Sequence, residues 1–161
     1  MMKIGVISDT HLASPNPDLD RIVRDYFGSV DLLIHLGDYV DYSVASFLMN
    51  HREFVGVAGN MDPPDIRNVF PRKRLLEFGG FRIGVIHGWG APFGLEDKIF
   101  KEFHDVHAIL YGHTHKAVNH QRKGILFFNP GSPTRSFLGK PTVGLVSIGD
   151  AIRGEILAVD R

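Results

Sequence analysis

Seven residues with metal-binding side chains occur in five short polar segments of this sequence. They are two aspartates, one asparagine and four histidines: Asp9, His11, Asp38, Asn60, His87, His113 and His115. Hard divalent cations prefer carboxylate and amide oxygen, whereas imidazole suits Mn, Fe, Co, Ni and Zn. One carboxylate can bridge two ions about 3.5–4 Å apart, the spacing used in two-metal hydrolysis of phosphate esters. The set therefore predicts a metalloenzyme with two ions.

Each polar segment directly follows an apolar run that is typical of a buried strand. The five runs are residues 4–7, 32–36, 54–57, 83–86 and 108–111. Parallel strands direct their C-terminal loops to one edge of a sheet, so these segments are expected to meet there. An isolated aspartate in such a position is more often a turn or cap residue, and an isolated histidine is more often structural. Seven together make chance a poor explanation.

The first part of the chain predicts alternating strands and helices. Strands are expected at residues 3–8, 31–36 and 53–57, and helices at 17–27 and 43–50. Asn16 is placed to cap the first helix, Pro17 suits its first position, and Gly28 ends it. This order builds a parallel sheet.

The pattern then becomes mainly β. Strands at 73–78 and 81–86 flank Gly79-Gly80, a hairpin signal. A helix is expected at 94–104, and strands at 106–111, 117–121, 125–128, 142–148 and 152–159. Pro63-Pro64 is interpreted as a loop. Two sheets packed face to face, with helices outside, accommodate this order in a single domain spanning residues 1–161.

Composition narrows the partners and the ligands. Lysine plus arginine equals aspartate plus glutamate at 18 each, which argues against long duplex nucleic acid and an anionic membrane as partners. The chain has no cysteine, so a metal must use imidazole, carboxylate, amide or water. No signal peptide pattern or long apolar stretch occurs, and a cytoplasmic location is the default expectation.

The order of the motifs resembles the calcineurin-like metallophosphoesterase family, most closely its small single-domain phosphodiesterase branch. The motifs are Asp-x-His, Gly-Asp-x-x-Asp, Gly-Asn-x-Asp, His-Gly and Gly-His-Thr-His, and the resemblance extends to residues 129–132. It implies an α/β fold, a four-layer α/β/β/α sandwich of two mixed sheets. It also implies one ion held by Asp9, His11, Asp38 and His115, and a second held by Asp38, Asn60, His87 and His113. Asp38 would then be the bridge.

The resemblance further implies that a hydroxide between the two ions attacks phosphorus. Asp38, Asn60 and His87 are the residues that it assigns to catalysis. Met61 departs from the wider family, which commonly has a histidine at this position that assists the leaving group. A thioether cannot protonate a leaving group. Diesters and activated aryl esters should suffer least from this change.

The leading hypothesis is a phosphodiesterase that uses two divalent ions, with Mn first and Ni, Co, Fe, Zn or Mg as alternatives. Its substrate would be a small phosphate ester, with a nucleotide among the candidates. A phosphomonoesterase or nucleotide hydrolase on the same site is the first rival. A non-catalytic interaction module of the same fold, as in a retromer subunit, ranks lower because the ligand set is intact. The sequence does not decide the physiological substrate, the metal, or whether the protein forms a homo-oligomer.

Five further residues have open or structural roles. Asp62 can orient a ligand or cap a loop, and Asp41 is interpreted as a solvated turn acid. His35 lies within a strand and is expected to be a buried, hydrogen-bonded histidine. Trp89 more often packs under a loop than stacks on a base. Arg135 is expected to be an exposed loop arginine rather than a substrate ligand.

Overall fold

The computed structural model describes residues 1–134 and 139–160, and within this part ten strands form two five-stranded sheets. The first sheet has the order β10-β9-β1-β2-β3. Its strands are β1 (Met2–Ile7), β2 (Leu32–His35), β3 (Phe54–Gly56), β9 (Thr142–Ile148) and β10 (Ile152–Ala158). Strands β1, β2 and β3 are parallel, whereas β9 and β10 run antiparallel to their neighbours. The sheet is therefore mixed, as the sequence predicts.

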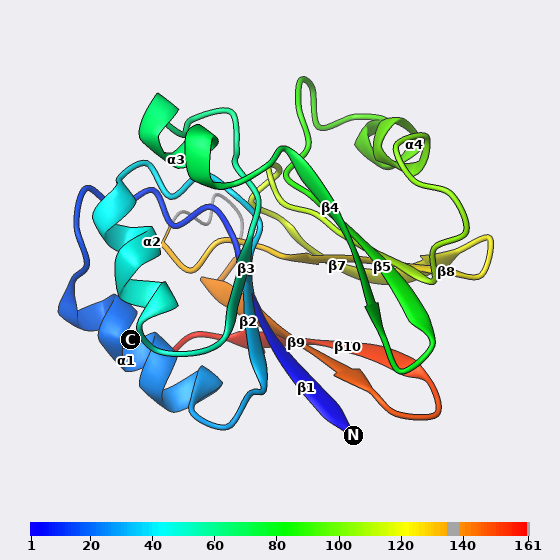
Figure 1. Ribbon diagram of the computed structural model, residues 1–161, viewed down its shortest axis with the longest axis horizontal. Helices are drawn as coiled ribbons and strands as arrows, with labels where there is room; N and C mark the ends of the chain where they lie inside the picture. Colours follow the sequence, from blue (N-terminus) through cyan, green and yellow to red (C-terminus); the bar gives the residue numbers. More distant parts are fainter. Residues whose placement is uncertain (135–138, 161) are drawn as a thin grey trace.

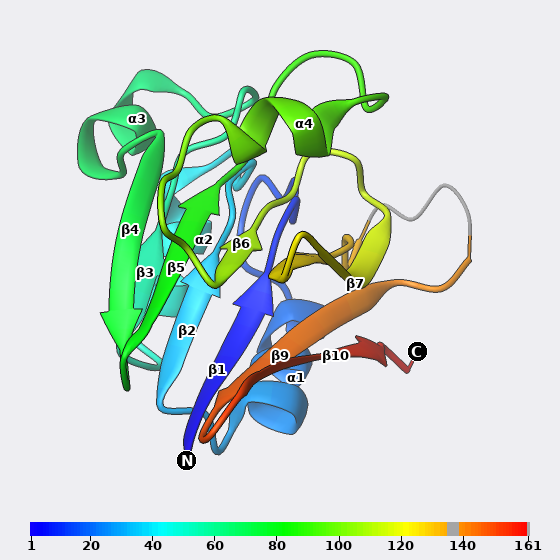
Figure 2. The same ribbon diagram turned by 90° about the vertical axis from the view of Figure 1, so that its right-hand side faces the viewer.

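The second sheet has the order β4-β5-β6-β8-β7. Its strands are β4 (Lys73–Phe78), β5 (Phe81–Ile86), β6 (Ala108–Leu110), β7 (Ala117–Arg122) and β8 (Ile125–Pro130). The central strands β5, β6 and β8 are parallel, and the edge strands β4 and β7 are antiparallel to them. Strands β1, β2, β5 and β6 all run toward one edge of the molecule (Figure 2).

The two sheets pack face to face and helices cover their outer faces (Figure 1). Buried side chains such as Ile34 from one sheet and Phe128 from the other fill the space between the sheets. Four helices occur in the described residues: α1 (Pro17–Phe27), α2 (Tyr42–Met49), α3 (Pro64–Val69) and α4 (Leu95–Phe100). Helices α1 and α2 pack on the first sheet and α4 packs on the second. The four-layer sandwich predicted from the sequence is confirmed.

Local signals explain several of these boundaries. Asn16 Oδ1 accepts a hydrogen bond from Leu19 N at 2.8 Å, which caps α1 as expected. Gly79 and Gly80 have φ of 56° and 81°, the left-handed backbone that a two-residue hairpin between β4 and β5 requires. No helix in the described part of the chain is long and apolar enough to cross a membrane.

Two expectations about helices are wrong. The segment after Pro63 is helix α3 rather than a loop, because Pro64 suits the first helical turn and Ile66 is fully buried against α2. Helix α4 ends at Phe100 instead of continuing to residue 104. The apolar spacing there reflects Phe103, which packs under the second sheet from outside the helix.

Candidate metal centre

The candidate ligands gather where strands β1, β2, β3, β5 and β6 end. Two groups of residues occur in the described part of the chain whose donor atoms, within each group, all lie within 4.8 Å of one another. One group is Asp9, His11 and His115, and the other is Asp9, Asp38 and His87. Asp9 belongs to both groups. Segments that lie far apart in the sequence therefore converge on one cluster, as the positions of their strands require.

Asp9 lies at the centre of this cluster and is fully buried. Its Oδ1 is 3.2 Å from His115 Nε2, 3.6 Å from His11 Nε2 and 3.7 Å from His87 Nε2, yet it accepts no well-formed hydrogen bond from the described residues. Its Oδ2 accepts from Ser8 Oγ at 2.5 Å and from the backbone N–H of His113 at 3.1 Å. A buried carboxylate oxygen that faces three imidazole nitrogens fits a divalent cation.

Asp38 faces both groups with a single oxygen. Its Oδ2 is 3.3 Å from His87 Nε2 and 3.5 Å from His11 Nε2. Its Oδ1 accepts a hydrogen bond from the N–H of Met61 at 2.8 Å, which fixes the orientation of the carboxylate. Asn60 completes this side of the cluster, because its Oδ1 is 3.1 Å from His87 Nε2.

A hydrogen bond to the backbone fixes the orientation of the His87 ring. Its Nδ1 donates to the carbonyl oxygen of Leu36 at 2.6 Å, so Nε2 points toward the carboxylates. Burial lowers the pKa of His87, but the carboxylates of Asp38 and Asp9 outweigh burial and raise this pKa to about 9. Burial likewise opposes ionisation of Asp9, but the neighbouring imidazoles of His11 and His115 hold its pKa well below the usual range. The cluster thus keeps its carboxylates ionised.

His113 lies beside the cluster but outside both groups of close donor atoms. Its Nε2 donates to the carbonyl oxygen of Gly90 at 2.6 Å, and its ring centroid is 5.3 Å from that of His87. This hydrogen bond leaves Nδ1 as the nitrogen that can bind a metal. The seven predicted ligands therefore lie at one place, with His113 outside the two groups of close donor atoms.

The loops of the cluster are conformationally strained. Five of the seven candidate ligands have positive φ: Asp9 (56°), His11 (45°), Asp38 (61°), His113 (74°) and His115 (59°). Such angles are uncommon for residues other than glycine and concentrate at functional sites. The glycine of the Gly-Asn motif is required for close approach, because a Cβ on Gly59 would overlap the carboxylate and backbone of Asp38.

Asp62 joins two of these loops. Its Oδ2 accepts from the N–H groups of Asp38 and Gly59, both at 2.8 Å, and its Oδ1 accepts from Val40 N–H at 2.9 Å. Burial raises the pKa of Asp62, against the effect of these hydrogen bonds. Of the two roles left open by the sequence, the structure shows loop capping, and the capped loop carries Asp38.

His35 and Asp41 have structural roles. Gly37 N–H donates to His35 Nδ1 at 3.0 Å, so the ring proton is on Nε2, which is 3.1 Å from Thr10 Oγ1. Burial lowers the pKa of His35 to about 3, and the ring is neutral as expected for a core histidine. Asp41, expected as a solvated turn acid, caps α2 by accepting from Ser43 N–H at 2.9 Å.

The end of β8 and the residues that follow it support the cluster through the backbone. Asn129 Nδ2 donates to the carbonyl oxygen of Gly112 at 3.1 Å, and Ser132 Oγ donates to that of Asp9 at 2.8 Å. The family resemblance extends to residues 129–132 but does not reveal that Asn129 and Ser132 brace two ligand loops. Arg135 lies outside the described residues.

Two side chains at the rim have the characters expected of them. Met61 is 58% exposed beside Asn60 and has no proton to give a leaving group. Trp89 packs against two cations, with Arg72 Cζ 4.7 Å and Lys98 Nζ 5.2 Å from its ring centroid. Lys98 also donates to the carbonyl oxygen of Trp89 at 2.7 Å. Trp89 therefore fixes the loop that carries Gly90, the acceptor for His113.

Comparisons with known proteins find relatives that match most of the chain. A family model described as "Calcineurin-like phosphoesterase superfamily domain" matches residues 2–151. A probable metallophosphoesterase of Methanocaldococcus jannaschii is 36% identical over 163 residues, which cover 99% of this chain and 83% of the relative. A phosphodiesterase of the same organism is 30% identical over 159 residues, which cover 90% of this chain and 92% of the relative.

Solved structures share the fold. The solution structure of a Thermotoga maritima protein superposes with a TM-score of 0.75 at 34% identity, covering 98% of this chain and 99% of that protein. Vacuolar protein sorting 29 of Cryptosporidium parvum gives a TM-score of 0.74 at 21% identity, covering 98% of both chains. At that identity the second likeness shows the fold alone.

Proposed function

Because the chain belongs to the calcineurin-like phosphoesterase superfamily, we propose that it is a metal-dependent phosphodiesterase with two divalent ions. The observation that carries this proposal is the buried Asp9 Oδ1, which faces the Nε2 atoms of three histidines without a well-formed hydrogen bond from the described residues. One of the relatives is itself named a phosphodiesterase, which supports the diester as substrate.

The residues of the cluster divide into two sets around the shared aspartates. His11 and His115 would hold one ion together with Asp9 and Asp38. We assign the other ion to the remaining residues of the set: Asp38, Asn60, His87 and His113. Asp38 Oδ2 suits the bridging role because it lies within 3.5 Å of one histidine from each set. When bound, two ions of the Mn²⁺ type polarise phosphoryl oxygens and lower the pKa of water.

The chain's own residues position the substrate and limit the reaction. Asn60 presents an amide beside His87, where it can donate to a phosphoryl oxygen once its Oδ1 binds a metal. Met61 favours diesters that carry a good leaving group, since no proton donor replaces the family histidine at this position. Turnover of a monoester, including a nucleotide, should therefore be slower than turnover of the matching diester.

Substitution of the cluster tests this proposal. Asp38→Asn and His87→Ala should each lower kcat for bis(p-nitrophenyl) phosphate with Mn²⁺ by about 10³-fold or more, the size of losing an electrostatic stabiliser in a catalytic site. Asp150→Asn and His104→Ala are matched controls at exposed positions and should retain the wild-type rate. Circular dichroism checks folding. A folded Asp38→Asn protein with the wild-type rate would refute the mechanism, and faster turnover of p-nitrophenyl phosphate would favour the monoesterase.

A further inference from the structure

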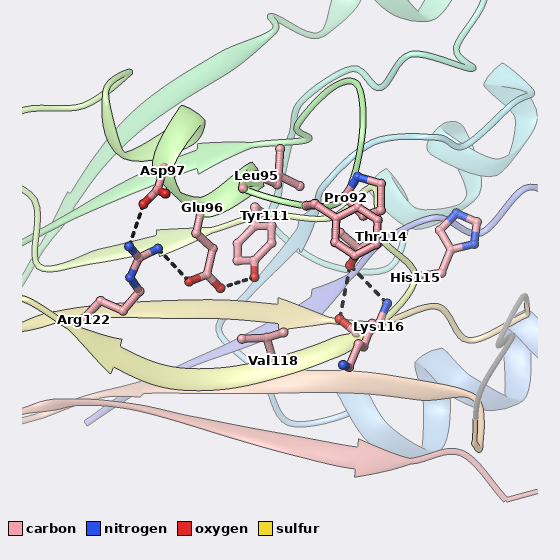
Figure 3. Close-up of a pocket in the computed structure, with 12 residues that line it drawn as sticks. Pro92, Leu95, Glu96, Asp97, Tyr111, Thr114, His115, Lys116, Val118 and Arg122 are labelled. Carbon is pink, nitrogen blue, oxygen red and sulfur yellow. Dashed lines mark hydrogen bonds and ion pairs between the residues drawn. The ribbon is translucent and has the colours of Figure 1, made fainter.

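A cavity of about 570 Å³ opens beside His115 and extends between α4 and strand β7 (Figure 3). Its walls are residues 92–97 on one side, and Tyr111, residues 114–116, Val118 and Arg122 on the other. Cavities of 300–1,000 Å³ are the usual size for small-molecule sites. Since His115 is a candidate metal ligand, a substituent of a phosphate held by the metals can reach into this cavity.

Four polar side chains at one end of the cavity wall are paired with one another: Glu96, Asp97, Tyr111 and Arg122. Glu96 accepts from Tyr111 Oη at 2.6 Å and from Arg122 Nη1 at 3.2 Å, and Asp97 accepts from Arg122 Nη2 at 2.6 Å. Figure 3 shows this chain of interactions along one end of the cavity. Thr114 Oγ1 accepts from the N–H of Lys116 at 3.2 Å. Because these groups already have hydrogen-bond partners, the remaining wall offers mainly apolar surface to an occupant.

The apolar surface of the cavity is partly aromatic. Leu95 and Tyr111 form its buried part, and Val118 is half-buried between them and solvent. Phe93 lines the rim and is 88% exposed, although a large apolar side chain is costly to leave in water. An exposed aromatic ring at the mouth of a cavity provides a face on which a planar group can stack.

Lys116 gives the mouth of the cavity a positive charge. It directly follows the candidate ligand His115, its side chain is exposed, and no described residue pairs with its ammonium group. A phosphodiester carries one negative charge at the phosphorus and none on an aryl or nucleoside substituent. The charge at the metal end and the apolar surface beyond it match this division.

We propose that the cavity beside α4 holds a ring-bearing ester substituent of the substrate, with Phe93 stacked on the ring and Lys116 attracting the phosphate. The occupant is an aromatic ring, either a simple aryl group or a nucleobase. This assignment rests on the proposed function, because the metal cluster sets the position of the phosphorus. It makes Phe93 and Lys116 specificity-determining residues.

Binding of two phosphonates tests the assignment without turnover, because their carbon–phosphorus bond is not hydrolysed. Calorimetry on the Mn²⁺-loaded protein should find phenylphosphonate bound about 10- to 100-fold tighter than methylphosphonate, the effect of burying one ring. Phe93→Ser should remove most of this ratio, and Leu75→Ser, at an exposed apolar position on β4, should preserve it. Lys116→Gln should weaken both ligands by a similar factor and leave the ratio unchanged.

A nuclear magnetic resonance titration gives a second readout. Phenylphosphonate, but not methylphosphonate, should shift the methyl resonances of Leu95 and Val118. Adenosine 5′-monophosphate, compared in the same way, separates the two sources of the ring: tighter binding than phenylphosphonate assigns a nucleobase, and weaker binding assigns a simple aryl group.

The outcomes for the cavity and for the proposed function are separable. Equal affinity for the two phosphonates, in a protein that hydrolyses bis(p-nitrophenyl) phosphate, overturns the cavity assignment and leaves the function standing. A clear preference for phenylphosphonate, in a loaded protein that hydrolyses no diester, overturns the function and leaves the cavity as a binding site.

Discussion

The two sides of the metal cluster are supported very differently. On the His87 side, formed by Asp38, Asn60 and His87, hydrogen bonds from outside the cluster fix the ligands: His87 Nδ1 donates to Leu36 O, and Asp38 Oδ1 accepts from Met61 N–H. Asp62 adds a third support by accepting from Asp38 N–H. Partners of this kind set the orientation and basicity of metal ligands.

On the His115 side, formed by His11 and His115, the structure shows support for the backbone of the ligand loops. The two Nε2 atoms are 3.3 Å apart, and the ring of His11 has no hydrogen bond through Nδ1 to any described residue. Support comes from Asn129 and Ser132, which bind carbonyl oxygens of the ligand loops rather than the rings. The difference indicates that the ring of His87 is preorganised for its ion, whereas the ring of His11 becomes ordered as the ion binds.

Of the substitutions that test this difference in support, Asp62→Asn is expected to have the largest effect on Mn²⁺ affinity. The amide has only one acceptor oxygen, so its NH₂ faces either the N–H of Val40 or the N–H groups of Asp38 and Gly59, and the loop that carries Asp38 loses at least one of its two hydrogen bonds to residue 62. Affinity for the tighter of two Mn²⁺ ions should fall by about 10- to 100-fold, the usual cost of losing a support to a metal ligand. Titration calorimetry measures both affinities.

Asp65→Asn is the matched control, since Asp65 is exposed at the start of α3. It should leave both ions unaffected. If Asp62→Asn weakens only the looser ion, the assignment of the stronger support to the His87 side is wrong.

A second expected effect follows from the pKa of His87, which its carboxylate neighbours raise against burial to about 9 from an ordinary 6.5. In the metal-free protein this ring is protonated below pH 9, so an ion on the His87 side must displace a proton. Affinity for Mn²⁺ should therefore fall by about tenfold per pH unit below that value for each proton displaced. Calorimetry in buffers of different ionisation enthalpy counts the protons.

The same shift has a consequence for the stability of the metal-free protein. Because the folded pKa of His87 is raised, its stabilisation is fully present below about pH 6.5 and is lost as the pH rises through about 9. Thermal unfolding of the metal-free protein should show this loss, and His104→Ala should follow the wild-type curve. Equal Mn²⁺ affinity at pH 6 and pH 9, with no proton released, would contradict the predicted displacement of a proton from His87 by the metal.

Sequence patterns predict which residues meet in the cluster, because each candidate ligand has a short-range signal. Asp9 and His87 follow apolar runs that form buried strands, and parallel strands bring their ends together wherever the sheet order permits. The hairpin at Gly79 and the cap at Asn16 are local as well. Such features depend on residues only a few positions apart.

The supports and the cavity have no such signal. Asp62 reaches the loop of Asp38, 24 residues earlier, and Ser132 reaches Asp9 across 123 residues. Helix α3 is not predicted from the sequence because it is too short for a periodic apolar pattern and is stabilised by the burial of Ile66 against α2. The cavity beside α4 exists only once β7 and α4 face each other, which neighbouring residues cannot reveal.

The smallest effect is expected from Val40→Gly, which separates strain from support. Val40 has φ of 82°, an unfavourable backbone for a β-branched residue, on the loop that Asp62 caps. The substitution removes a backbone strain of about 1–3 kcal/mol, but it adds the entropy cost of glycine and loses some packing. The free energy of unfolding should therefore rise by up to about 1 kcal/mol. Chemical denaturation of the metal-free protein measures it.

Lys123→Gly is the control for this comparison, since Lys123 has φ of 53° in the exposed turn between β7 and β8, away from the cluster. Both variants should be stabilised, and Mn²⁺ affinity should stay unchanged in both, because the backbone N–H of residue 40 still donates to Asp62 in the glycine variant. If Val40→Gly alone weakens Mn²⁺ binding, the valine side chain itself holds the ligand loop, and Asp62 is not sufficient support for the His87 side.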